Sequence, residues 1–270
     1  MRSKIYLACI VFVVASLSGS LGLALDPMGP PAAKLKQGQF AAGAEYSYSE
    51  MDIKTDTPRV TILGVPVAGL LSSGTMKDVR SNRFYANFGV GLMDDVELFV
   101  RLGAADARPD ASTVVNDVGD LLGDSQYGFA VGAGAKATLW KNEDNTLKLG
   151  ALAQVSWTRF MFDDPIMMLS QDTDISFFEI QLAVGPTYSP MEGVSIYGGP
   201  FFHFIDGHLE LTASMLGTPV ATLSANLEQD SVFGGFVGGE IDFTENLSLR
   251  AEYQFTAGAW AVTTGISWAF

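Results

Sequence analysis

The stretch "RFYANFGVGLMDDVELFVRLG", residues 83–103, alternates apolar and polar side chains on both sides of a short turn. One face of this alternation is uncharged before and after the turn, whereas the other face carries Arg83, Glu97 and Arg101. Successive side chains of a β-strand point to opposite faces, so the stretch predicts an antiparallel hairpin with one apolar face. That face consists of Phe84, Ala86, Phe88, Val90, Leu92, Val96, Leu98, Val100 and Leu102.

The same period-two pattern recurs along the rest of the chain. The predicted strands are joined alternately by short polar turns and by longer segments, which is the layout of an up-and-down antiparallel β-barrel. No charged residue falls on the apolar face of any strand, and a lipid-facing charge near the bilayer midplane would cost about 2–4 kcal/mol. We therefore predict an all-β transmembrane barrel of about ten strands, or twelve if two further hairpins cross the membrane. The strands are predicted near residues 40–48, 82–92, 96–105, 127–139, 147–158, 176–188, 194–205, 232–243, 247–255 and 260–270.

The N-terminus has the three-part order of a secretory signal. Arg2 and Lys4 precede an apolar run, and small residues follow that run up to Ala24. This order predicts a signal peptide over residues 1–24, cleaved after Ala24, that directs export through the inner membrane. An uncleaved membrane anchor is the alternative, although serines and glycines interrupt the apolar run well short of a full span.

Removal of the signal peptide defines the remaining organisation. We predict a periplasmic N-terminal tail over residues 25–37 and an outer-membrane barrel over residues 38–270. Cys9, the only cysteine, lies in the signal, so no disulfide is expected in the mature chain. The signal carries two positive and no negative charges, so its removal lowers the formal net charge from −14 to −16. Nucleic acid, whose backbone attracts Lys and Arg, is therefore not an expected partner.

The last residues of the sequence read "TTGISWAF", residues 263–270. Thr263, Gly265, Trp268 and Phe270 resemble the C-terminal signal by which the barrel-assembly machinery recognises its substrates. Residues 38–270 thus resemble the bacterial outer-membrane β-barrel superfamily, and their layout is similar to small barrels of the OmpA and OmpX kind or ten-stranded barrels of the omptin and OpcA kind. The resemblance implies a Gram-negative-type outer membrane, with lipid, lipopolysaccharide and the assembly machinery as partners.

The face opposite the apolar one carries acidic and basic residues in nearly equal number. Inside a narrow ten-stranded barrel these side chains face one another, so we expect ion pairs that hold the interior and close the lumen. The alternative is a small porin-like passive channel, in which the same charges line a narrow pore. The predicted network comprises Glu45, Arg83, Glu97, Arg101, Lys136, Lys148, Glu179, Glu240, Arg250 and Glu252.

Two long connections, residues 50–81 and 206–231, contain the near-repeats "LGVPVA" and "LGTPVA". In each connection, Gly-x-Pro between β-rich stretches predicts a hairpin that projects beyond the membrane. The apolar residues of the hairpins are expected either to pack on each other over the barrel mouth or to contact a surface ligand or protein partner. The long connections are also acidic, which indicates solvation beside an anionic surface or, alternatively, weak divalent-cation binding.

These features predict a non-catalytic outer-membrane protein with a structural or surface-contact role. An omptin-like outer-membrane protease is a further alternative, because Asp172, Asp174, Asp206 and His208 resemble the acid and imidazole pairs of that family. The surrounding sequence does not match the family, and no other catalytic or cofactor motif occurs. We therefore expect no enzyme activity, no cofactor and no metal site.

Two prolines fit a closed barrel poorly. Pro186 and Pro200 lie within predicted strands, where each removes an N–H donor from the ladder. We expect a β-bulge at "YGGPF", residues 197–201.

Overall fold

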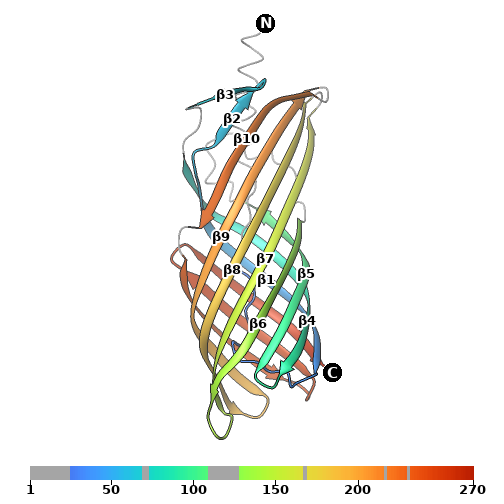
Figure 1. Ribbon diagram of the computed structural model, residues 1–270, viewed down its shortest axis with the longest axis vertical. Coiled ribbons are helices and arrows are strands. Elements are labelled where there is room, and N and C mark those ends of the chain that lie inside the picture. The colour runs from blue at the N-terminus through green and yellow to red at the C-terminus, as the bar shows by residue number, and fades with distance from the viewer. Residues whose placement is uncertain (1–24, 69–72, 109–127, 167–168, 216–217, 230–231) are drawn as a thin grey trace.

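The computed structural model shows one antiparallel sheet of thirteen β-strands (Figure 1). The proposed signal peptide and the acidic connection after residue 108 fall outside the described residues, so cleavage after Ala24 remains a prediction. Within the described part of the chain, no helix is long and apolar enough to cross a membrane. The described residues are 25–68, 73–108, 128–166, 169–215, 218–229 and 232–270.

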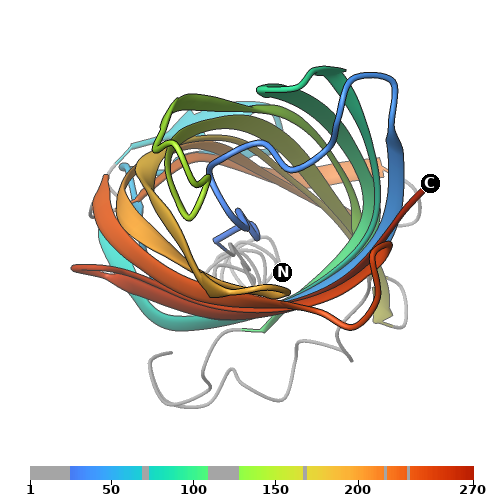
Figure 2. The same ribbon diagram turned by 90° about the horizontal axis from the view of Figure 1, so that it is seen from below.

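Ten of the strands form a closed up-and-down barrel, as the alternation predicted. The barrel closes because β13 pairs with β1 in a continuous antiparallel register from Ala41↔Ala269 to Met51↔Ala259. Figure 2 shows the closed ring of strands from its short-turn end. The ten strands are β1 (Phe40–Thr55), β4 (Gly74–Met93), β5 (Val96–Arg108), β6 (Gly128–Lys141), β7 (Leu147–Ile166), β8 (Leu169–Met191), β9 (Val194–Met215), β11 (Phe233–Asp242), β12 (Leu247–Thr256) and β13 (Ala259–Ala269).

The two faces of the wall differ as the sequence predicted. On β4 and β5, the outward side chains of Phe84 and Val100 are about half exposed, at 51% and 48%. The inward side chains of Arg83, Tyr85 and Arg101 are buried. An apolar outer face around a polar interior is the arrangement of a barrel whose solvent is lipid.

The strands β7, β8 and β9 continue far beyond the ends that the sequence analysis assigned to them. Residues 159–175 and 206–231 are therefore largely strand rather than loop. The reason is that the polarity of the two faces changes along the strand while the alternation continues. Near the membrane, β8 points Phe178 outward and Glu179 inward. Farther from the short-turn end, it points Asp174 outward and Ile175 inward. Above the lipid the outer face contacts water, so a polar exterior and an apolar interior become favourable. The predicted strands were too short because each was taken to end where its outer face becomes charged.

Both near-repeats form hairpins, as predicted. The first lies between β2 (Arg59–Ile62) and β3 (Val65–Val67), and its turn places Leu63 and Gly64 at positive φ, 51° and 78°. The second joins β9 to β10 (Thr218–Gln229). β2 pairs directly with β10, from Ala221↔Ile62 to Ser224↔Arg59, and the amide of Leu63 donates to the carbonyl of Val220 at 2.9 Å, so the two hairpins lie side by side. Neither hairpin adds a strand to the closed ring of ten.

The projecting part of the wall has an apolar interior of its own. β9 pairs with β11 up to Phe233↔Phe202 and with β10 from Glu228↔Asp206 onward. β10 then reaches β1 at Ile53↔Gln229, so it bridges the wall above the short strands β11 to β13. The enclosed side chains stabilise the projection by burial of apolar surface. They include Met51, Ile53, Leu209, Leu211, Leu223 and Leu227.

The expected bulge at residues 197–201 does not form, because β9 keeps a continuous register with β11 through this region. The β8–β9 ladder is instead interrupted between Ala183↔Phe201 and Thr187↔Tyr197. Both prolines lie in this interval, where the backbones approach closely and a Cβ on Gly185 would overlap the carbonyl oxygen of Gly198. Pro186 and Pro200, which lack N–H donors, thus lie in the same gap of the β8–β9 ladder, and no extra residue is inserted as in a β-bulge.

A charge on the outer face of the wall should destabilise the folded barrel. We expect Val100→Lys to lower the free energy of unfolding by about 2–4 kcal/mol, measured by denaturant titration in lipid vesicles. Leu63→Lys is the control, since Leu63 is 54% exposed on the β2–β3 hairpin beyond the ring. Equal effects of the two substitutions would contradict a lipid-facing position for Val100.

Candidate functional site

The segment before β1 lies inside the barrel and not outside it as a periplasmic tail. Residues 25–33 and Leu35 are buried, whereas Lys34 and the residues from Lys36 up to β1 are partly or fully exposed. Figure 2 shows this segment, in blue, running from the rim into the lumen. We call residues 25–36 the plug segment. The prediction of a periplasmic tail over residues 25–37 is therefore corrected. Polar side chains of the wall form hydrogen bonds with this segment, which holds it inside the lumen.

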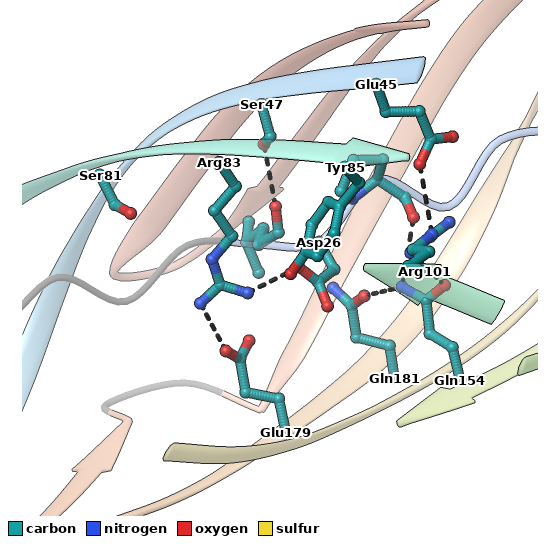
Figure 3. Close-up of polar contacts among 12 residues, drawn as sticks. Asp26, Glu45, Ser47, Ser81, Arg83, Tyr85, Arg101, Gln154, Glu179 and Gln181 are labelled. Atoms are coloured by element: carbon teal, nitrogen blue, oxygen red, sulfur yellow. Dashed lines mark hydrogen bonds and ion pairs between the residues drawn. The ribbon is translucent and has the colours of Figure 1, made fainter. Parts of the chain in front are cut away.

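The side chain of Asp26 is buried among polar side chains of the wall (Figure 3). Arg83 donates from Nη1 to Asp26 Oδ1 at 2.6 Å, and the hydroxyl of Tyr85 donates to the same oxygen at 2.9 Å. The Nη2 atom of Arg83 donates to Glu179 Oε1 at 2.5 Å, and His203 Nε2 lies 3.2 Å from Glu179 Oε2. One buried arginine therefore joins the plug segment to β8 and, through Glu179, to β9.

The backbone around Asp26 is held by side chains of the wall. Glu252 of β12 accepts hydrogen bonds from the amides of Met28 and Gly29, at 3.1 and 2.9 Å. Gln254 donates to the carbonyl of Asp26 at 2.8 Å, and Ser47 donates to that of Leu25 at 3.1 Å. Buried backbone groups need such partners, so these bonds fix an extended chain that has no strand beside it.

The plug segment is anchored a second time near the short-turn end. Glu97 accepts hydrogen bonds from the amides of Lys34 and Leu35, at 3.2 and 3.3 Å. The ammonium of Lys34 pairs with Glu240 and, at 2.5 Å, with Asp242. Burial lowers the pKa of Lys34, but these carboxylates outweigh that effect and hold its pKa above the ordinary value. Lys34 is therefore charged at neutral pH.

Gly91 allows the plug segment to leave the lumen close to the wall. The amide of Gly38 donates to the carbonyl of Gly91 on β4 at 2.8 Å, and the amide of Gly91 donates to the carbonyl of Gln39 at 2.9 Å. A Cβ at Gly91 would overlap the carbonyl oxygen of Lys36. Only glycine leaves room for this crossing.

The charged residues predicted for the lumen are divided between wall and plug. Arg101 and Arg250 both pair with Glu45, and Arg101 also donates to Gln154 at 3.0 Å. Glu97, Glu240 and Glu252 bind the plug segment instead of wall cations. In the described part of the chain, no carboxylate lies within 4 Å of the ammonium of Lys136 or Lys148. Glu97 and Arg101 both point inward from β5, but Glu97 binds backbone amides and Arg101 binds Glu45 and Gln154.

Four further members of this site, Asp26, Tyr85, His203 and Gln154, were not predicted from the sequence. His203 and Gln154 occupy the same inward positions as the predicted charges, so a search for every polar inward residue would have found them. Asp26 gave no comparable signal, because an extended segment rich in proline and alanine has no periodicity. Its place in the lumen emerges only when the wall is assembled.

The residues of the C-terminal signal lie on both faces of β13. Thr263 points inward and is buried, while the aromatic side chains of Trp268 and Phe270 are 60% and 67% exposed. Phe270 exchanges two backbone hydrogen bonds with Phe40, at 2.8 and 3.0 Å, and their rings stack at 6.3 Å. Gly265 lies beside Glu45 and Arg250 in the lumen. The aromatic end is accessible from outside, while recognition by assembly machinery remains a prediction.

The residues that resemble the omptin pairs lie on the outer side of the projecting wall. Asp174 is held by Arg159 through bonds of 3.0 and 2.5 Å. His208 lies 3.4 Å from Asn226 on β10, and Asp206 follows the same outward face of β9. Among the described residues, no group of three or more His, Cys, Asp or Glu could hold a metal ion.

Comparison with known proteins gives the class of fold. No protein-family model matches the chain, and no curated protein matches it. Among solved structures, it is similar to the outer-membrane protease OmpT from Escherichia coli, with 11% identity over 91% of this chain and 99% of that chain and a TM-score of 0.49. It is also similar to the outer-membrane protein OprG from Pseudomonas aeruginosa, with 11% identity over 87% and 97% and a TM-score of 0.46.

The chain has the fold of a bacterial outer-membrane β-barrel. Its own geometry carries this conclusion: a closed antiparallel ring with an uncharged outer face and a charged interior. The resemblance to that superfamily, stated from the sequence, is confirmed. The structural likenesses are too distant to indicate an activity.

Loss of the central arginine should destabilise the barrel. Arg83→Met leaves the buried carboxylates of Asp26 and Glu179 without a cation, so we expect the free energy of unfolding to fall by about 3–5 kcal/mol. Denaturant titration of the refolded barrel measures this. Lys141→Met removes an exposed pair with Asp95 and should have little effect. Recovery of stability on adding Asp26→Asn and Glu179→Gln would identify the unmatched charges as the cause, and an undiminished loss would contradict it.

The aromatic end of β13 can be tested separately. Phe270→Asp should reduce the amount of barrel inserted in outer membranes, because recognition by the assembly machinery needs the exposed ring. The purified variant should still refold in detergent and migrate differently before and after boiling. Phe243→Asp is the control, because Phe243 is another exposed aromatic residue at the short-turn end, 63% exposed. Normal insertion of Phe270→Asp, or an equal defect in Phe243→Asp, would contradict the role of Phe270 as an assembly signal.

Proposed function

We propose that this protein is a non-catalytic outer-membrane barrel whose lumen is closed and whose projecting wall contacts molecules at the cell surface. The observation that carries the proposal is the plug segment, held inside the lumen by both side-chain and backbone bonds. A barrel filled in this way is suited to presenting a rigid surface rather than to conducting solutes.

Closure of the lumen rests on two independent anchors. The first is the buried pair of Asp26 with Arg83, and the second is the grip of Glu97 and Lys34 near the short-turn end. Hydrogen bonds to charged groups contribute about 1.5–3 kcal/mol each, and most of these would have to break together for the segment to leave. Spontaneous opening of the pore is therefore expected to be rare.

The projecting wall supplies the contact surface. It is built from paired strands around an apolar interior, which gives it a fixed shape. At its β2–β3 hairpin, Leu63 and Val65 are 54% and 62% exposed, so they offer apolar contacts to a surface ligand or protein. Residues 50–81 and 206–231 contribute this surface, while lipid, lipopolysaccharide and the assembly machinery are the proposed partners of the barrel itself.

We propose that the protein is not catalytic because of where the candidate catalytic residues lie. Asp174 is bound to Arg159, and His208 and Asp206 project from the outer side of a sheet. A general base and its acid partners need a concave site in which a substrate is positioned. A protease role would require a substrate to be bound on an outward-facing wall.

Single-channel conductance in planar bilayers tests the closed lumen. The wild type should conduct little, and Asp26→Ala combined with Glu252→Ala should raise the conductance several-fold, because the inner anchor of the plug segment is lost while only the Glu97–Lys34 anchor remains. The matched control is Glu143→Ala with Asp144→Ala, which removes the same charge from an exposed turn and should change nothing.

Two results would replace the proposal with another function. A large, steady conductance of the wild type would favour the porin-like channel. Peptide cleavage that His208→Ala abolishes would favour the omptin-like protease.

A further inference from the structure

A small cavity lies along the wall at the short-turn end of the barrel. Its volume is about 50 Å³, and it is bounded by β1, β4, β5, β6, β12 and β13. Gly43 and Gly89 have no side chain to fill it, whereas Arg101, Lys136 and Arg250 all reach its surface. Three cations and one carboxylate, Glu97, thus line one space.

Two of these cations converge on a single point of the plug segment. A Cβ built on Gly29 would lie 2.9 Å from Arg250 Nη1 and 3.2 Å from Lys136 Nζ. Two positive groups that close to one point repel each other unless a negative group lies near both. The side chain of Lys136 is only 7% exposed, so water screens this repulsion poorly.

The neighbouring carboxylates are already bound elsewhere. Glu45 is shared by Arg101 and Arg250. Glu97 accepts the amides of Lys34 and Leu35, and Glu252 accepts those of Met28 and Gly29 together with a bond from Gln254. In the described residues, no carboxylate lies within 4 Å of the Lys136 ammonium, although Glu97 stands opposite Lys136 in the β5–β6 register. The centre of the Phe99 ring lies 5.7 Å from the ammonium. A buried ammonium that makes no direct ion pair is unfavourable, so Lys136 can accept a negative group that reaches it through the cavity.

The cavity also offers a neutral donor and a way in. Asn87 lines it, and its Oδ1 is buried without a hydrogen-bond partner in the described part of the chain. Rotation of the amide exchanges its O and N, so Asn87 can present its NH₂ group to an acceptor. Gly43, Glu97 and Ser267 at the rim are partly exposed, so a solute can enter from the short-turn end.

We propose that this cavity binds a small anion with several oxygens, of the class of inorganic phosphate or a short carboxylate. Lys136 and Arg250 are its principal ligands, with Arg101 and Asn87 on the flanks. The space accommodates roughly three to five groups of the size of a water molecule, which fits such an anion. The site goes beyond the proposed closure of the lumen, since the plug segment is anchored by Asp26, Glu97 and Glu252 whether or not an anion is bound.

Titration calorimetry of the full mature protein, refolded in detergent and dialysed into a buffer of weakly binding anions, tests the site. Inorganic phosphate, acetate and chloride are titrated at constant ionic strength. We expect phosphate or acetate to bind and to raise the melting temperature, and Lys136→Met to weaken that binding about tenfold or more. Lys141→Met removes an exposed lysine of the same strand, paired with Asp95, and should bind as the wild type does.

A second variant keeps every charge and removes only space. A Cβ at Gly89 would lie 3.3 Å from Leu35 Cδ1 and 3.8 Å from Glu97 Oε1, so Gly89→Ala fits with a small shift and should also weaken binding. If Lys136→Met fails to fold, as judged by migration before and after boiling, anion binding by Gly89→Ala tests the proposal in its place. The proposal is overturned if the wild type binds neither phosphate nor acetate, if chloride binds equally well, or if Lys141→Met weakens binding as much as Lys136→Met.

Discussion

The buried ion pair between Arg83 and Asp26 connects the membrane-spanning wall to the segment that fills it. Arg83 also binds Glu179, which meets His203, so one guanidinium joins β4, β8 and the plug segment. A planar guanidinium can bind two carboxylates at once, which a lysine ammonium does less well. Because each partner would otherwise be a buried unmatched charge, the integrity of the wall and the closure of the lumen depend on the same contact.

The alternation of side chains predicted the ten-stranded ring from the sequence, but not the full height of its wall. Strand positions near the membrane followed from one rule, that the face towards lipid is uncharged. The rule fails above the lipid, where Ile175 and Phe177 turn inward and Asp174 faces water. The period of two is intact there and only the faces exchange roles. Strand ends in such barrels are therefore better sought where alternation stops than where the apolar face becomes polar.

The candidate site was predictable only in its wall. Inward positions such as Glu45, Arg101 and Glu179 could be read from the parity of each strand. Their partners could not, because the pairing depends on a segment that has no strand pattern and that the sequence analysis placed outside the barrel. Equal numbers of acids and bases suggested mutual pairing, yet Glu97 and Glu252 bind backbone amides instead. Charge balance on one face does not determine which groups meet.

The composition of the plug segment explains why it can lie in a barrel without disturbing it. Pro27, Pro30 and Pro31 have no N–H, so they leave no donor to be satisfied in the lumen. Two glutamates each accept a pair of consecutive amides, Met28 with Gly29 and Lys34 with Leu35. The segment therefore needs no strand edge and leaves the ladder of the wall intact. The same arrangement turns two carboxylates towards backbone amides, and Lys136 is left without a direct ion pair because of how the lumen is closed.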